Sequence, residues 1–278
     1  MDNLERFNLE RLKKLRSRIE KCKGDYTLYA IDVDDVVYDT DPVMQRILGE
    51  IDKRATTFYR EEIAREPSED STQEMEKSFK ILNAILEETP YYEEQFDGSF
   101  RKIDYPRINY NSVYIDENLL NKSIPYMNQM LRNREDNEFY IYLSHCNPER
   151  EGIIKTERLY EHTPKIDGIM TLPFHVEVGK SEISSKAKHL LTNLQIDSLT
   201  NCVLIDNSKR NCRDWRNYGG TDIRFLPTGH APNEDDIDRI TKISSLDPRL
   251  IKRSLELIKY LRANPICNEE STKKLIKK

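Results

Sequence analysis

Three aspartates, Asp32, Asp34 and Asp35, follow a short apolar run at residues 26–31. The run reads Tyr-Thr-Leu-Tyr-Ala-Ile and is rich in β-favouring residues, so it predicts a buried strand. Open α/β sheets bind ligands beyond the carboxyl ends of their strands, which is where these acids stand. Neighbouring carboxylates repel one another unless a cation lies between them, and a hard divalent ion such as Mg²⁺ prefers oxygen ligands. The alternative is an acidic turn after an ordinary strand.

Polar residues also follow other apolar runs of the chain. The run at 138–143 ends at Ser144, and the run at 202–205 ends at Asp206. Lys180 directly precedes a segment with a helical pattern. Because the carboxyl ends of parallel strands meet at one edge of a sheet, we expect these side chains to gather near the first acidic cluster.

This set of side chains suits phosphoryl transfer, in which positioning and charge neutralisation dominate catalysis. One carboxylate can attack phosphorus and form an acyl phosphate. A second acid two residues away can protonate the leaving oxygen and then activate water. A serine hydroxyl and a lysine ammonium can hold the non-bridging oxygens, and a distant aspartate can complete the oxygen shell of Mg²⁺.

Four motifs in this order resemble those of the haloacid dehalogenase-like (HAD) phosphatases. They are Asp32-Val33-Asp34-Asp35-Val36, Tyr142-Leu143-Ser144, Gly179-Lys180-Ser181-Glu182, and Ile205-Asp206-Asn207-Ser208-Lys209-Arg210-Asn211 followed by Tyr218-Gly219-Gly220. The first motif is the most specific, and the four together span about residues 26–226. Asp35 stands where a glycine is commoner in the family.

The resemblance implies a role for each matching residue. Asp32 would be the nucleophile and Asp34 the general acid and base. Mg²⁺ would be held by the carboxylates of Asp32 and Asp206 and by the backbone carbonyl of Asp34. Ser144 and Lys180 would bind the phosphate group.

Some positions depart from the family pattern or leave a choice open. Asn207 replaces a second acid, so we expect it, like Asn211, to act as an outer-shell contact of the metal. His145 follows the phosphate-binding serine and could contact the phosphate, although a local hydrogen bond is the alternative. Lys186 and Lys188 compete with the lysine of the third motif, but both fall inside the helical pattern.

The alternation of strand and helix patterns predicts an α/β fold, a Rossmann-like parallel sheet flanked by helices. Further strands are expected at 168–172 and 222–226. Two antiparallel helices inserted after the first strand would form a helical cap of type 1, the class that the resemblance implies. The expected division is 1–24 as an amphipathic helix, 25–40 and 116–246 as the core, 41–115 as the cap, and 247–278 as a C-terminal helix and tail.

Composition narrows the classes of partner. The 278 residues carry 44 Lys and Arg against 49 Asp and Glu, a net charge of −5, which argues against extensive binding to nucleic acid. The five cysteines form no CxxC pair, so neither a zinc site nor a disulfide framework is expected. With no apolar run long enough for a membrane span, and no signal core, we expect a cytoplasmic protein without a membrane partner.

The cap and the fourth motif look similar to those of the 5′(3′)-deoxyribonucleotidase branch, so a nucleoside monophosphate is the leading substrate. Residues 90–115 are rich in aromatic and basic side chains, which could cross the mouth of the site, stack a base and, through Arg101, Lys102 or Arg107, support phosphate binding. An irregular surface loop is the alternative. Another small phosphate ester such as a sugar phosphate, a polynucleotide end, and non-catalytic capture of a phosphorylated ligand remain open. The oligomeric state is not predicted.

Overall fold

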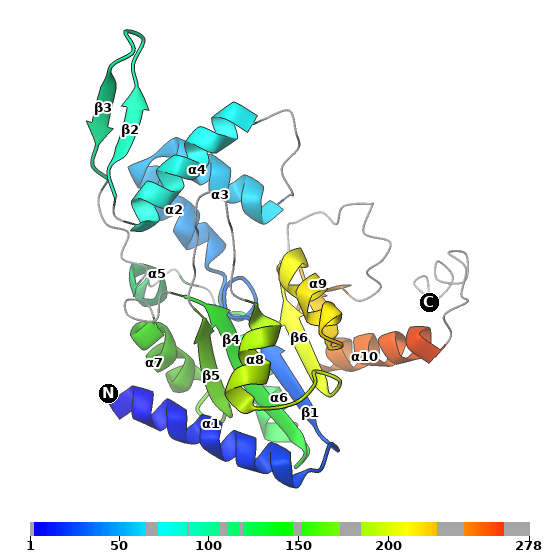
Figure 1. Ribbon diagram of the computed structural model, residues 1–278. Coiled ribbons are helices and arrows are strands. Elements are labelled where there is room, and N and C mark those ends of the chain that lie inside the picture. The colour runs from blue at the N-terminus through cyan, green and yellow to red at the C-terminus, as the bar shows by residue number, and fades with distance from the viewer. Residues whose placement is uncertain are drawn as a thin grey trace.

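A computed structural model of the chain describes residues 3–64, 72–87, 89–105, 111–116, 119, 121–146, 152–172, 185–226 and 242–263. Its centre is a parallel sheet with the strand order β5-β4-β1-β6-β7-β8 (Figure 1). The strands are β1 (Thr27–Ile31), β4 (Glu138–His145), β5 (Gly168–Leu172), β6 (Cys202–Asp206), β7 (Thr221–Phe225) and β8 (Lys242–Ile243). This order and the helical crossovers confirm the predicted Rossmann-like α/β fold.

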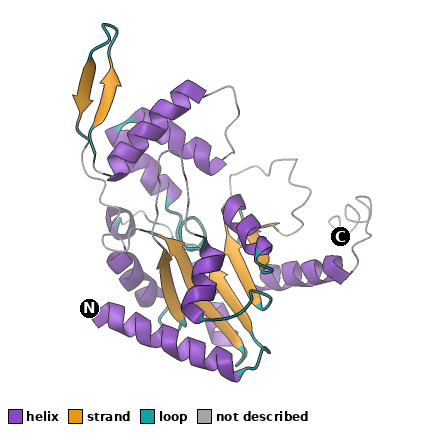
Figure 2. Cartoon of the chain, in the orientation of Figure 1, coloured by secondary structure: helices purple, strands orange, loops and turns teal. Residues whose placement is uncertain are grey.

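Both faces of the sheet are covered by helices, as Figure 2 shows. Alternate residues of β1 point to opposite faces, so Leu28 and Ala30 join one hydrophobic cluster while Tyr29 and Ile31 join the other. The first cluster is packed by α1 (Asn3–Lys21), α8 (Lys186–Leu194) and α9 (Lys209–Asn217), and the second by α6 (Ile124–Asn133), α7 (Gly152–His162) and α10 (Pro248–Ala263). Burial on both faces explains why β1 is a nearly continuous apolar run.

The segment inserted after β1 forms a helical unit beyond the carboxyl edge of the sheet (Figure 1). It contains α2 (Asp41–Ile51), α3 (Lys53–Ala64) and α4 (Thr72–Glu87). The periodicity predicted one helix where α2 and α3 stand. The first helix ends before Asp52, which is extended. The Asp52 carboxylate oxygen Oδ1 accepts a hydrogen bond of 2.8 Å from the backbone N–H of Arg54 and so caps the start of the second helix.

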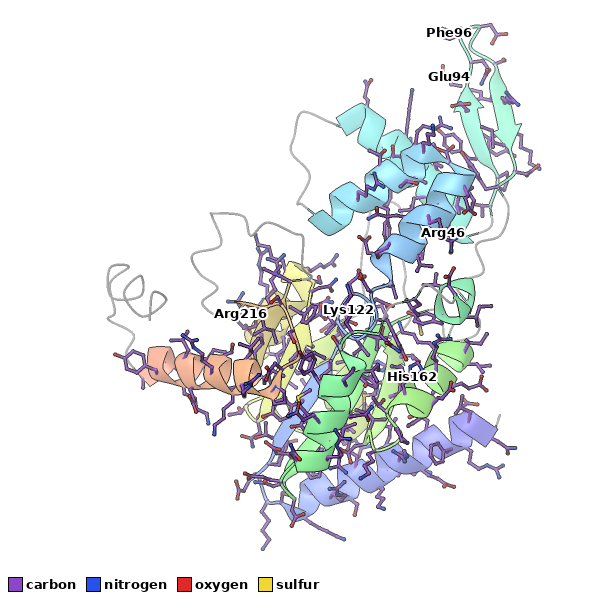
Figure 3. The ribbon with its side chains drawn as sticks, turned by 180° about the vertical axis from the view of Figure 1, so that it is seen from behind. Arg46, Glu94, Phe96, Lys122, His162 and Arg216 are labelled. Atoms are coloured by element: carbon purple, nitrogen blue, oxygen red, sulfur yellow. The ribbon has the colours of Figure 1, made fainter. Side chains whose placement is uncertain are left out.

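The first part of the segment at 90–115, up to residue 103, differs from the expectation that it crosses the mouth of the site. Strands β2 (Tyr91–Glu94) and β3 (Phe100–Ile103) form an antiparallel hairpin, followed by α5 (Asn111–Ile115). The hairpin extends away from the sheet, with Glu94 and Phe96 at its far end (Figure 3). Arg101 and Lys102 lie on this hairpin and not at the carboxyl edge of the sheet. Arg107 lies outside the described residues.

None of the helices that the structure describes is long and apolar enough to cross a bilayer. The predicted N-terminal helix lies against β5, α7 and α8, and it buries Leu15 and Ile19. The buried part of its apolar stripe is therefore covered by contacts within this chain.

Candidate active site

The three central strands bring the predicted acidic and hydroxyl residues to one edge of the sheet. Ile31 of β1 is in register with Tyr142 of β4 and with Ile205 of β6. Asp32 and Asp206 are the next residues along β1 and β6, whereas Ser144 comes two residues after Tyr142 on β4. The backbone N–H of Asp32 donates to the carbonyl of Ile205 at 2.9 Å. Register therefore places the two carboxylates side by side, and the end of β4 brings the Ser144 hydroxyl to the same edge of the sheet, where it donates to Asp34.

A buried lysine links the two carboxylates. The ammonium Nζ of Lys186 lies 2.7 Å from Asp32 Oδ1 and 2.7 Å from Asp206 Oδ2. Lys186 is the first residue of α8, which begins after Ser185, whose hydroxyl accepts a hydrogen bond from the N–H of Lys188 and caps the helix. The Lys186 side chain is 1% exposed, so its charge depends on these two partners.

Charge crowding perturbs the Asp32–Lys186–Asp206 group. Burial and the neighbouring Asp206 carboxylate raise the pKa of Asp32 to about 7, although the Lys186 ammonium opposes the shift. Burial alone would lower the pKa of Lys186, but the two carboxylates outweigh it and the pKa is raised. The lysine therefore stays charged, and Asp32 lies in an excess of negative potential.

A second buried lysine, Lys155 of α7, makes the other half of the site. Its Nζ lies 2.6 Å from Asp34 Oδ2 and 2.6 Å from the hydroxyl of Ser144. Ser144 also donates to Asp34 Oδ2 at 3.2 Å, and the hydroxyl of Tyr114 donates to Asp34 Oδ1. Both oxygens of Asp34 are thus engaged. The Lys155 ammonium also lies 4.9 Å from the centroid of the Tyr114 ring.

Asp34 is held ionised by this environment. Burial raises the pKa of Asp34, but the charge of Lys155 and the hydrogen bonds from Lys155, Tyr114 and Ser144 together outweigh burial, so the pKa lies below its usual value. Tyr114 is positioned by an edge contact with Tyr38, at 6.2 Å between ring centroids. The Tyr38 hydroxyl is in turn hydrogen-bonded to Nδ1 of His162, which Figure 3 shows on α7.

The tight turn after Asp34 explains the residue at position 35. Asp35 has φ +57°, the left-handed region that glycine adopts freely and that Asp tolerates better than most residues. Its Oδ1 accepts hydrogen bonds from the hydroxyl of Thr40, at 3.1 Å, and from the N–H of Asp41, at 2.7 Å. Asp35 therefore caps α2, since the side chain of Thr40 makes no capping hydrogen bond itself.

Asp206 is fixed by its own loop. The N–H of Ser208 donates to Asp206 Oδ1 at 2.7 Å, and the side-chain amide of Asn211 donates to Oδ2 at 3.0 Å. Asn207 is half-buried next to it, and its backbone carbonyl accepts a hydrogen bond from Arg224 Nε at 3.4 Å. Asn211 therefore touches the predicted metal ligand directly, whereas the position of Asn207 is compatible with an outer contact.

The donor set fits a hard cation better than a soft one. Within the described part of the chain, no three His, Cys, Asp or Glu side chains form a ready-made metal cluster. Asp32 and Asp206 converge, while the side chain of Asp34 turns toward Lys155. Burial, and after it the Asp206 carboxylate, raises the pKa of Asp32. Two carboxylates and the backbone carbonyl of residue 34 would suit Mg²⁺ with water completing its shell.

The predicted residues Asp32, Asp34, Ser144 and Asp206 thus meet at one edge of the sheet. Lys180 lies outside the described residues. Lys186, the alternative to Lys180 that ranks lower in the sequence because it falls inside the helical pattern, is the first residue of α8, and its ammonium lies between two carboxylates. His145 ends β4 and is partly buried; the hydroxyl of Ser144 lies 3.4 Å from its backbone carbonyl.

Sequence reasoning missed Lys155 and Tyr114, because neither follows a predicted strand. One signal was available for Lys155. The buried residues of α7 are Gly152, Lys155, Thr156, Leu159 and Tyr160, spaced three and four apart, so the lysine lies on the helix stripe that faces the protein. A lysine on such a stripe is unusual unless it is paired.

No family model matches the sequence, and no curated protein does. Among solved structures, the chain is similar to the putative HAD-hydrolase YfnB from Bacillus subtilis, described as bound to magnesium, with 12% identity and a TM-score of 0.46 over 81% of this chain and 96% of that one. The chain is also similar to a haloacid dehalogenase-like hydrolase from Streptococcus pneumoniae, with 13% identity and a TM-score of 0.45 over 85% of this chain and 98% of that one. A putative β-phosphoglucomutase from Thermotoga maritima is similar with 13% identity and a TM-score of 0.40, over 84% of this chain and 99% of that one. These likenesses concern the fold alone.

Proposed function

We propose that this chain is a HAD-type phosphatase, which hydrolyses phosphate monoesters through a phosphorylated aspartate, Asp32. The observation that carries the proposal is the convergence of Asp32, Asp34, Ser144, Lys186 and Asp206 at the carboxyl edge of the sheet. An acidic turn with only a structural role would not need two buried lysines paired with its carboxylates, because burying each ammonium is costly.

In the first step, Asp32 attacks phosphorus. Among the described residues, its side-chain contacts with Lys186 and with the N–H of Val33 both go to Oδ1, which leaves Oδ2 for the attack. The bond from phosphorus to the leaving oxygen breaks, and that oxygen takes a proton from Asp34. Asp34 is ionised in the free site, so it must first take up this proton from solvent, which the negative charge of the bound phosphate favours. Ser144 and Lys186 are placed to hold non-bridging oxygens as charge develops on them.

In the second step, water hydrolyses the aspartyl phosphate. Asp34 accepts a proton from the water, whose oxygen attacks phosphorus, and the bond from phosphorus to the Asp32 oxygen breaks. The lowered pKa of Asp34 suits this base role, since the carboxylate is ionised in the free site. Inorganic phosphate leaves, and Asp32 is regenerated.

Mg²⁺ is the proposed cofactor, held by Asp32, Asp206 and the backbone carbonyl of Asp34. When bound, it would offset the repulsion between the nucleophilic carboxylate and the phosphate dianion. The proposal is supported by the oxygen-only donor set and by the convergence of the Asp32 and Asp206 carboxylates.

The proposed substrate is a nucleoside monophosphate, which follows from the resemblance of the cap and fourth motif to the 5′(3′)-deoxyribonucleotidase branch. A sugar phosphate would use the same core residues. Of the aromatic residues in the inserted segment, Tyr114 reaches the site, while Phe96 and Phe100 are exposed on the hairpin. Whether the cap selects the leaving group is therefore tested by comparing nucleoside monophosphates with the smaller sugar phosphates.

The test is phosphate release with Mg²⁺ from ribo- and deoxyribonucleoside monophosphates and from sugar phosphates, for the wild type and Asp32→Asn. Release that the substitution abolishes supports the aspartyl-phosphate mechanism, and the substrate order identifies the leaving group. Release from sugar phosphates alone removes the nucleotidase assignment. The hydrolase proposal fails if the folded wild type releases phosphate from none of them.

A further inference from the structure

Lys155 has two partners that belong to different parts of the proposed chemistry. Its Nζ lies 2.6 Å from Asp34, the proposed acid and base, and 2.6 Å from the hydroxyl of Ser144, a proposed phosphate ligand. Its side chain is 1% exposed. An ammonium group buried to this degree is costly, and a leucine or methionine would fill the same space on α7 without that cost.

The position of Nζ limits what Lys155 can contact when a substrate binds. An ammonium has three N–H donors, and its contacts with oxygen atoms of the described residues use two of them. A phosphoryl group held by Ser144 and cleaved next to Asp34 must lie close to both residues. Since Nζ is within hydrogen-bonding distance of both, it lies within reach of such a group.

Charge points the same way. Lys186 stands on the side of Asp32 and Asp206, whereas Lys155 stands on the side of Asp34 and Ser144. A phosphate dianion that enters between them meets an ammonium on each side. Charge-assisted hydrogen bonds of this kind are about twice as strong as neutral ones.

We propose that Lys155 is a second phosphate-binding lysine, which holds a non-bridging oxygen together with Ser144 and is paired with Asp34 when no phosphate is bound. The inference rests on the proposed function for the identity of the bound group. It adds a cationic ligand from α7, outside the four motifs, and it divides the phosphate-binding charge between two buried lysines.

The alternative role for Lys155 is that of a counter-ion for Asp34 alone, and a pair of variants separates the two. In Asp34→Asn the carboxylate that needs a counter-ion is gone. Adding Lys155→Met to this variant then removes only what the lysine does for the phosphate. The double variant also leaves no buried carboxylate unpaired, so it should fold where Lys155→Met alone does not.

The experiment measures the affinity for inorganic phosphate by calorimetry in the presence of Mg²⁺. We expect Asp34→Asn/Lys155→Met to bind phosphate about 10- to 100-fold more weakly than Asp34→Asn, as for loss of a hydrogen bond to a charged group. Lys165→Met, which replaces an exposed lysine just beyond α7, should match the wild type. Equal affinities of the single and double variants overturn the inference, as does a wild type that binds no phosphate.

Binding and turnover are read separately. A wild type that binds phosphate through Lys155 but releases none from any monoester keeps this inference and removes the hydrolase proposal. If the wild type hydrolyses monoesters but the phosphate affinity does not depend on Lys155, the hydrolase proposal stands and this inference is overturned.

Discussion

The ammonium of Lys186 lies 2.7 Å from Asp32 Oδ1, and it lies at the same distance from Asp206 Oδ2. The first residue of a helix on one face of the sheet is thereby tied to the carboxyl ends of two adjacent strands. Because all three side chains are buried, the pairing matters both for the fold and for the proposed chemistry.

Replacement of this lysine should affect stability and activity together. Lys186→Met leaves two buried carboxylates without their shared cation, so we expect a loss of about 3–5 kcal/mol in the free energy of unfolding. Phosphate release should fall on the order of a thousandfold or more, since a cationic phosphate ligand is lost. Denaturant unfolding and steady-state kinetics measure the two effects.

Lys188→Met is the matched control, because Lys188 is exposed on the same helix. Its stability should stay within about 0.5 kcal/mol of the wild type. Equal behaviour of the two variants would show that Lys186 does not carry the role assigned to it.

The site shows which residues a single sequence can indicate. Asp32, Ser144 and Asp206 follow apolar runs, and the rule that parallel strands end at one edge is enough to bring them together. Lys155 and Lys186 depend on how helices rotate and where they begin, which periodicity fixes only to within a few residues. The predicted start of α8 at Ser181 was five residues early, and that error hid the position of Lys186.

The hairpin in the inserted segment has a local signal in its sequence. Asp97-Gly98 lies between the residues that form β2 and β3, and this dipeptide favours a tight hairpin turn. Gly98 has φ +77°, and the N–H of Gln95 donates to the carbonyl of Ser99 at 2.8 Å. Turn chemistry, rather than aromatic content, is what determines the path of this segment.

The turn at Asp35 predicts a dependence of stability on pH. Burial raises the pKa of Asp35 to about 8, far above its value in an unfolded chain. The folded state therefore retains a proton that the unfolded state loses, and stability falls as pH rises from about 4 to about 8. Asp35→Asn keeps the acceptor for Thr40 and Asp41, tolerates positive φ, and has no proton to lose.

We therefore expect Asp35→Asn to gain stability relative to the wild type as pH rises through this range. The gain should reach on the order of a few kcal/mol. Each unit by which the pKa of Asp35 in the folded state exceeds its value in the unfolded state corresponds to ~1.4 kcal/mol. Urea unfolding at pH 5 and pH 8 measures it. The exposed Asp136→Asn should show no such difference. A constant difference between Asp35→Asn and wild type at both pH values would contradict the assignment.

Tyr114 should act on the chemical step through Asp34. Tyr114→Phe removes the hydroxyl that donates to Asp34 Oδ1 but keeps the ring beside Lys155 and Tyr38. Loss of one hydrogen bond to a charged group should lower kcat about tenfold. Steady-state kinetics at several pH values measures the effect, and Tyr92→Phe on the exposed hairpin is the control. An unchanged kcat would mean that this hydrogen bond does not serve catalysis.

Magnesium should stabilise the protein through Asp206. A ligand that binds only the folded state raises its stability by ~2.7 kcal/mol at about 100 times Kd. Thermal unfolding of the wild type should therefore shift upward with added Mg²⁺. In Asp206→Asn the shift should be lost, because one of the two converging carboxylates is gone and the amide is a poorer ligand for a hard cation.

The comparison with a surface variant separates a site from general ionic effects. Glu94→Gln lies at the far end of the hairpin (Figure 3) and should keep the full Mg²⁺ shift. If Mg²⁺ acted only by screening the net charge of −5, both variants would respond equally, since each removes one negative charge. A shift that survives in Glu94→Gln and disappears in Asp206→Asn therefore shows that the cation binds at Asp206. If the two variants show an equal shift, the Mg²⁺ ion binds elsewhere.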